Sequence, residues 1–145
     1  MTEIAFHFNV PDKLAYSCRL LRKAYLSGAS VVVTGEPMLL TELDQLMWSF
    51  SAAEFIPHCR AGAAGHTVAV SPVVLAESLQ DCPHYGVLVN LGQGIPPEFE
   101  RFERFIELVA RDEDDRLAAR RRWKHYTDRG YAMKRHDLAI AGEGA

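Results

Sequence analysis

The sequence predicts a single α/β domain built around a mostly parallel sheet. Strand-like and helix-like patterns alternate through the first fifty residues, which is typical of consecutive βαβ units. The run Val31-Val32-Val33 is short, apolar and β-branched, as in strands that are buried on both faces of a parallel sheet. The chain has 145 residues, 48% of them apolar, which suits one hydrophobic core.

Two strand–helix pairs are expected in the first half of the chain. Apolar and polar residues alternate over residues 4–8, which indicates the first strand. Asp12 can cap the helix that follows, and Gly28 can end it. Residues 30–34 are then expected to form a strand and residues 38–50 a helix. The apolar stripe expected on this second helix consists of Leu39, Leu43, Leu46, Met47 and Phe50.

Patterns in the second half are weaker. Residues 68–70 suggest a strand, whereas residues 72–84, with a proline near each end, are expected to be irregular or weakly helical. Residues 85–91 read as a buried strand. Residues 104–109 fit either a helix or a buried strand, and the strand is favoured because an acidic run then separates it from the last helix. The domain is expected to span residues 1–140, with a flexible tail over residues 141–145.

The most distinctive segment is the basic and aromatic stretch over residues 116–135. It holds eight of the sixteen Lys and Arg residues. An acidic run over residues 112–115 precedes it, and Gly130 interrupts it. Acids at the start and bases toward the end match the helix dipole, so a helix is expected that begins in the acidic run and stops at Gly130.

One face of this predicted helix is suited to binding a carboxylate. The residues that share this face by their spacing are Arg116, Arg120, Trp123 and Thr127. Lys124 flanks them. Two guanidiniums can bind a carboxylate while an apolar group packs against the neighbouring indole. The alternative is a solvated basic face whose aromatic rings pack on the sheet.

Charge and composition narrow the class of protein. The net charge is −3 although the last quarter of the chain is basic, which points to a localised acidic partner. Three irregularly spaced cysteines are expected to be reduced thiols, as in a cytoplasmic protein. The N-terminus lacks a signal-peptide pattern, and no apolar run approaches the ~20 residues that span a bilayer. We therefore expect a soluble, cytoplasmic protein without a membrane partner.

No complete catalytic or cofactor motif is present. The glycine pair Gly92-x-Gly94 follows a predicted strand, but Pro97 stands where a dinucleotide fingerprint needs its third glycine. The scattered His and Cys residues lack zinc-site spacing. We expect no catalytic residues, no metal and no cofactor, which favours a binding module. A small enzyme using Cys59 or Asp44 remains an alternative, as does direct binding of single-stranded nucleic acid through the basic and aromatic helix.

A second candidate surface lies near the end of the second predicted helix. Trp48 falls at the border of the apolar stripe or beyond it. Together with Phe55 and Pro57 it can form an apolar patch for a protein partner. The alternative is that Trp48 lies under the following loop while Phe55 fills the core.

Two motifs in this order resemble one protein family. The first is LDxxxWxxxxxxFIPH, formed by Leu43-Asp44, Trp48 and Phe55-Ile56-Pro57-His58. The second is RRWKHYTDRGY, which spans residues 121–131 and is preceded by Arg120. Together they resemble the chi subunit of bacterial DNA polymerase III, and the resemblance covers essentially the whole chain. The Trp at position 123 and the poor match after Tyr131 depart from the family pattern.

The resemblance implies a non-enzymatic adaptor in DNA replication with a three-layer, Rossmann-like fold and no nucleotide site. It implies that the protein joins the clamp loader through the psi subunit and binds the acidic C-terminal tail of single-stranded DNA-binding protein. The residues implied for the tail are Arg116, Arg120, Trp123, Lys124 and Thr127. The residues implied for the psi surface, where a repair helicase is also expected to compete, are Trp48, Phe55, Pro57 and His58.

Overall fold

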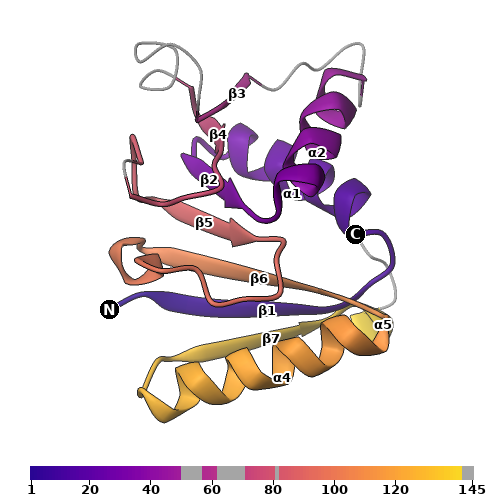
Figure 1. The fold of residues 1–145 in the computed structure, drawn as a ribbon, viewed down its shortest axis with the longest axis vertical. Coiled ribbons are helices and arrows are strands. Elements are labelled where there is room, and N and C mark those ends of the chain that lie inside the picture. The colour runs from indigo at the N-terminus through magenta and orange to yellow at the C-terminus, as the bar shows by residue number, and fades with distance from the viewer. Residues whose placement is uncertain (50–56, 62–70, 81, 142–145) are drawn as a thin grey trace.

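The chain forms one seven-stranded sheet with helices on both faces (Figure 1). The computed structural model describes residues 1–49, 57–61, 71–80 and 82–141. The strand order is β3-β4-β2-β5-β6-β1-β7, and every neighbouring pair is parallel. The strands are β1 (Glu3–Val10), β2 (Val31–Thr34), β3 (His58–Arg60), β4 (Val73–Leu75), β5 (Val87–Asn90), β6 (Arg104–Ala110) and β7 (Met133–Asp137). The helices are α1 (Lys13–Leu26), α2 (Pro37–Ser49), the 3₁₀ turn η1 (Phe99–Arg101), α4 (Glu113–Asp128) and α5 (Leu138–Ala141).

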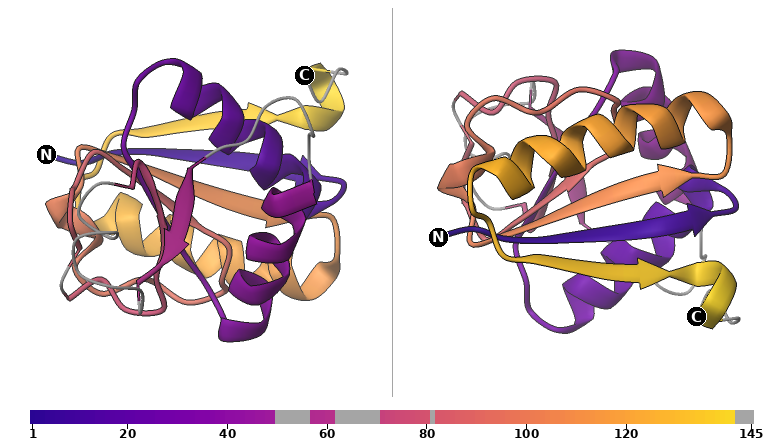
Figure 2. Two further views of the ribbon diagram at one scale, coloured as in Figure 1. Left: turned by 90° about the horizontal axis from the view of Figure 1, so that it is seen from above. Right: turned by 90° about the horizontal axis from the view of Figure 1, so that it is seen from below.

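Alternating side chains along the strands build a core on each face of the sheet. Val31 and Val33 pack with buried residues of α1 and α2, whereas Val32 points to the other face and packs with residues of η1 and α4. The two views in Figure 2 show α1 and α2 on one side of the strands and α4 on the other. The predicted α/β class with a mostly parallel sheet and three layers is therefore confirmed.

The predicted helix ends are confirmed at three positions. The Asp12 carboxylate accepts hydrogen bonds from two backbone N–H groups in the first turn of α1. The Asp112 carboxylate accepts one hydrogen bond from a backbone N–H group in the first turn of α4. Gly130 follows α4 with a φ of 80°, a left-handed conformation that glycine adopts without strain. Because Gly130 turns the chain back toward the sheet, it sets where β7 begins.

Strands β3, β4 and β7 were not predicted. Val73–Leu75 forms the buried strand β4, so the expectation of an irregular segment over residues 72–84 is wrong there. The prolines near the ends of this segment suggested a break in regular structure. Pro72 lies just before the strand, however, so its missing N–H removes no hydrogen bond between strands. Met133–Asp137 forms β7, in a region for which no element was predicted. On α2 the buried residues are Leu40, Leu43 and Met47, so the predicted stripe omitted Leu40.

Further predictions concern β6, the segment at residues 68–70 and the C-terminal tail. Residues 104–110 form the strand β6, as favoured over a helix. The strand suggested at residues 68–70, the side chain of Phe50 and the tail over residues 142–145 lie outside the described residues. Helix α5 ends at Ala141, the first residue of the predicted tail. Within the described residues, no helix is both long enough and apolar enough to cross a membrane.

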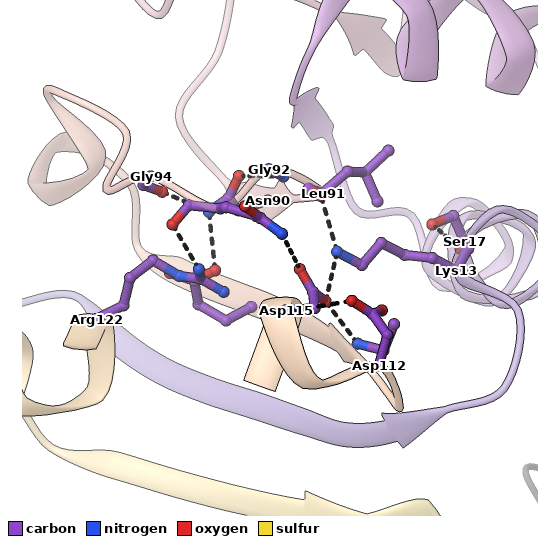
Figure 3. A network of polar contacts seen from close by, with 12 residues as sticks. Lys13, Ser17, Asn90, Leu91, Gly92, Gly94, Asp112, Asp115 and Arg122 are labelled. Atoms are coloured by element: carbon purple, nitrogen blue, oxygen red, sulfur yellow. Dashed lines mark hydrogen bonds and ion pairs between the residues drawn. The ribbon is translucent and has the colours of Figure 1, made fainter. Parts of the chain in front are cut away.

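An ion pair joins α1 to α4 at the carboxyl end of the sheet (Figure 3). Lys13 Nζ lies 2.9 Å from Asp115 Oδ2 and also donates a hydrogen bond to the carbonyl of Leu91, just after β5. Both side chains are largely buried. In parallel sheets this end commonly binds nucleotides; here it holds contacts between the protein's own side chains.

Candidate functional site

The inner face of α4, which packs on the sheet, carries both polar and apolar side chains. Its buried residues follow helical spacing and are Asp115, Ala119, Arg122 and Tyr126. The neighbouring row, one position further along the helix, begins with Arg116 and continues through Arg120 and Trp123. The orientation of the inner face therefore determines where this second row points.

A buried hydrogen-bond network fixes that orientation. Glu107 on β6 is fully buried and accepts hydrogen bonds from Arg122 Nε at 3.0 Å, from the Tyr126 hydroxyl at 2.6 Å and from Asn90 Nδ2 at 2.8 Å. Arg122 also donates to the carbonyl of Gln93 at 2.7 Å. Figure 3 shows Arg122 and Asn90 converging at this end of the sheet. Burial raises the pKa of Glu107, while the Arg122 charge and the hydrogen bonds to the carboxylate oppose that rise.

Beside this network, α4 and the strands β1 and β7 enclose a pocket of about 380 Å³. We refer to it as the α4 pocket. Its lining residues are Phe8, Asn9, Val109, Arg116, Ala119, Arg120, Trp123, Arg135 and Asp137. The lining therefore combines three guanidiniums and one carboxylate with an apolar wall of aromatic and aliphatic groups. This combination suits an anionic ligand with an apolar side chain.

Aromatic stacking holds the apolar wall in place. The Trp123 ring meets Phe6 edge-on, with ring centroids 5.1 Å apart, and lies 6.2 Å from Phe8. The guanidinium of Arg135 lies over both rings, with its Cζ atom 5.2 Å from the Phe8 centroid and 5.7 Å from the Trp123 centroid. These cation–π contacts orient Arg135 at the mouth of the pocket without neutralising its charge.

A bulge in β1 shapes the end of the α4 pocket. The pairing of β1 with β6 shifts between His7 and Val10, and Asn9 adopts a φ of 59°. Asn9 Nδ2 donates a hydrogen bond to Asp137 Oδ1 at 2.8 Å, and the same oxygen accepts one from the backbone N–H of Ala139. Asp137, the only carboxylate among the described residues of the lining, is thus engaged with donors of its own chain.

Three of the five residues predicted for the acidic tail come together in this pocket. Arg116, Arg120 and Trp123 line it. Lys124 does not; its side chain is 78% exposed and pairs with Asp128 at 3.4 Å. Thr127 is exposed and is also not among the lining residues.

Sequence reasoning missed the residues that β1 and β7 contribute. The sequence pattern places Phe8 only in a strand and assigns Arg135 no role. Cross-strand register explains their position, because Phe6 pairs with Arg135 and Phe8 with Asp137, so these side chains share the face under α4. The signal was weak because β7 is a polar edge strand whose existence was itself not predicted.

The second predicted surface is partly within the described residues. Trp48 is 63% exposed on α2, and its ring lies 5.3 Å from the ring of His58, centroid to centroid. His58 Nε2 is 3.1 Å from Asp44 Oδ1. The Asp, Trp and His of the first motif are therefore neighbours in space. Pro57 is half-buried, and Phe55 lies outside the described residues.

The remaining candidates for chemistry are dispersed. Cys18 and Cys59 are buried free thiols, Cys82 is a partly exposed one, and burial raises the pKa of Cys18 to about 11. Within the described ranges, no group of three or more His, Cys, Asp or Glu residues is arranged to hold a metal ion. His66, one of the scattered histidines of the sequence, lies outside those ranges.

Comparison with known proteins agrees with the two motifs. The family model for DNA polymerase III chi subunit, HolC, matches residues 1–134. DNA polymerase III subunit chi of Pseudomonas aeruginosa is 33% identical over 144 residues, which cover 95% of this chain and 98% of that protein. DNA polymerase III subunit chi of Haemophilus influenzae is 26% identical over 124 residues, 84% of this chain and 85% of that protein. The chain belongs to the DNA polymerase III chi subunit family.

Proposed function

We propose that this chi-family chain is a non-catalytic adaptor that links the clamp loader, through a psi subunit, to the acidic C-terminal tail of single-stranded DNA-binding protein. The observation that carries the proposal is the α4 pocket, where Arg116 and Arg120 stand beside the apolar wall of Trp123. The peptide tail is the ligand whose chemistry fits this arrangement.

The charges of the pocket suit a terminal carboxylate. Arg116, Arg120 and Arg135 surround the opening, and a planar guanidinium can donate two hydrogen bonds to one carboxylate. Acidic side chains upstream of the terminus would remain near the exposed part of α4, where Lys124 adds positive potential. The last side chain of the tail would pack against Trp123 and the aliphatic wall.

The expected affinity is moderate. Each charge-assisted hydrogen bond contributes roughly 1.5–3 kcal/mol before the cost of ordering the peptide. A single tail should therefore bind in the micromolar range, at about −8 kcal/mol. Several tails on one oligomeric partner would raise the effective strength through avidity.

The α2 surface is the proposed contact for psi. Trp48 exposes an indole beside His58, and an exposed aromatic anchor of this kind is typical of the centre of a protein interface. Pro57 and Phe55 are the other residues proposed to contribute. A repair helicase that recognises the same anchor would compete with psi at this surface.

The test of the pocket is a titration with an acidic peptide ending in Ile-Pro-Phe, followed by indole fluorescence. Because the chain has two tryptophans, a Trp48→Phe background leaves Trp123 as the only reporter. Arg120→Ala should weaken binding about tenfold, since it removes one charge-assisted contact. Binding should also weaken as salt is raised.

Arg121→Ala is the matched control, because Arg121 is exposed on the same helix but does not line the pocket. Equal binding by the parent and Arg120→Ala would refute the site. An equal loss in both variants would indicate diffuse attraction to the basic helix. Tight binding of a single-stranded oligonucleotide at physiological salt, without the peptide partner, would instead favour the nucleic-acid alternative.

A further inference from the structure

A second pocket, of about 360 Å³, lies on the opposite face of the sheet from α4. It is lined by the C-terminal half of α1 and by residues of β1, β2, β5, β6 and β7, and we refer to it as the α1 pocket. The lining residues on which its chemistry depends are Ala5, His7, Leu20, Lys23, Arg104 and Lys134. Neither the tail proposal nor the psi proposal uses any of them.

The fold leaves this part of the sheet open. Ile4 and Phe6 point toward α4, so strand alternation places Ala5 and His7 on the other face. The register of β7 sets Lys134 beside Ala5 and His136 beside His7. Helix α1 packs on β2 and β6, and the sheet continues past it to β1 and β7. The pocket lies where the sheet extends beyond α1, between that helix and the edge strand β7.

The rim of the α1 pocket is positively charged. Lys23, Arg104 and Lys134 are exposed, and none of the three forms an ion pair with a carboxylate of the described residues. Glu3 is the only acid that the described part of the chain contributes to the lining. The local field acts on His7, whose pKa is lowered to about 4, first by burial and then by the positive charges of His136, Arg104 and Lys23.

The floor of the pocket is aliphatic. It is formed by side chains such as Ala5, Leu20, Ala24 and Ile106. Among the described residues of the lining, Phe105 is the only Phe, Tyr or Trp, and it is fully buried. A single-stranded nucleic acid would find cations here but no exposed Phe, Tyr or Trp ring on which a base could stack, and the two imidazoles in the lining, His7 and His136, lie against each other with ring centroids 4.8 Å apart. Cations around an aliphatic floor fit acidic groups spaced by aliphatic side chains.

We propose that the α1 pocket is a second docking site, for an internal acidic segment of a protein partner that carries aliphatic side chains. The carboxylates contact Lys23, Arg104 and Lys134 while a Leu-sized side chain rests on the floor. β7 is at the edge of the sheet and, among the described residues, pairs only with β1. An extended segment beside Lys134 therefore also reaches the outward backbone groups of β7.

The probe is a fluorescein-labelled peptide Asp-Glu-Leu-Asp-Leu-Glu with a C-terminal amide, which has neither the aromatic residue nor the free carboxylate proposed for the α4 pocket. Its binding to the full chain is measured by fluorescence anisotropy at an ionic strength of about 0.05 M, where rim charges are weakly screened. Lys134→Glu and Arg104→Glu should each raise the Kd about fivefold or more. Both residues are exposed, so the fold should survive, which circular dichroism checks.

Two charge reversals on α4 serve as matched controls. Arg121→Glu and Arg120→Glu change the net charge by the same amount on the other face, and both should leave the Kd of this peptide within about twofold. The proposal is overturned if Arg121→Glu weakens binding as much as Lys134→Glu, or if Arg120→Glu abolishes it. It is also overturned if the parent does not bind the peptide at about 1 mM, or if an oligothymidine and not the peptide depends on Lys134.

Discussion

Single residues under α4 determine whether the basic face of this helix is oriented to bind a ligand. Glu107 and Arg122 form an ion pair with almost no exposed surface, and Tyr126 and Asn90 complete it with hydrogen bonds. A buried pair of this kind adds little net stability over apolar residues, but losing one partner is costly. We infer that its role is to fix the rotation of α4, so that Arg120 lines the α4 pocket.

Arg122→Met should lower the free energy of unfolding by about 3–5 kcal/mol, because it leaves the Glu107 carboxylate buried without its cation. Tyr126→Phe should cost about 1–2 kcal/mol, since it removes one hydrogen bond to that carboxylate. Urea unfolding measures both. The double variant Glu107→Gln with Arg122→Met should recover part of the loss. An Arg122→Met protein as stable as its parent would contradict this account of the network.

His7 should make stability depend on pH. Its folded-state pKa is about 4, below the ordinary value of 6.5, so the unfolded chain binds more protons between these values. The stabilisation is complete above pH 6.5 and is lost as the pH falls toward 4, by about 1–2 kcal/mol after allowing for partial exposure. His7→Gln removes this titration, so its unfolding free energy should fall less than that of the parent over the same range. Parallel pH curves for the two proteins would contradict the prediction.

The elements differ in how far their sequence predicts them. Helix α4 was predictable because its cap, its acidic first turn and Gly130 act locally. Strand β7 was not, because an exposed edge strand can be polar and short, and its pairing with β1 depends on residues far away in sequence. Arg135 was missed with it. The same holds for β4, whose three buried residues carry too short a pattern to distinguish a strand from a loop.

The turn between α4 and β7 provides a test at this scale. Gly130→Ala should lower the free energy of unfolding by about 1 kcal/mol, because an L-residue is strained at a φ of 80° although the added Cβ would meet no atom within 4 Å. Gly94→Ala is the control, since its Cβ is equally free and its φ lies outside the left-handed region. Chemical denaturation should find the control within about 0.5 kcal/mol of the parent. Equal losses in both variants would show that the backbone conformation is not the cause.

At the scale of the whole molecule, the sheet separates the surface proposed for psi from the pocket proposed for the acidic tail. Trp48 belongs to α2 on one face, and the α4 pocket lies on the other. An adaptor needs this independence, because each partner must bind while the other is held. The family and the α/β architecture could be recognised from two motifs and the βαβ rhythm. The composition of the α4 pocket could not, because β1 and β7 supply four of its nine lining residues through tertiary pairing.

The most direct test is a double dissociation. Immobilised parent, Arg120→Ala and Trp48→Ala proteins are each titrated with single-stranded DNA-binding protein and, separately, with psi from the same organism. Arg120→Ala should bind single-stranded DNA-binding protein at least tenfold more weakly than the parent does and bind psi with unchanged affinity. Trp48→Ala should bind psi at least tenfold more weakly and bind single-stranded DNA-binding protein with unchanged affinity. If either correctly folded variant loses both partners, or if both variants keep both, the assignment of two separate surfaces is contradicted.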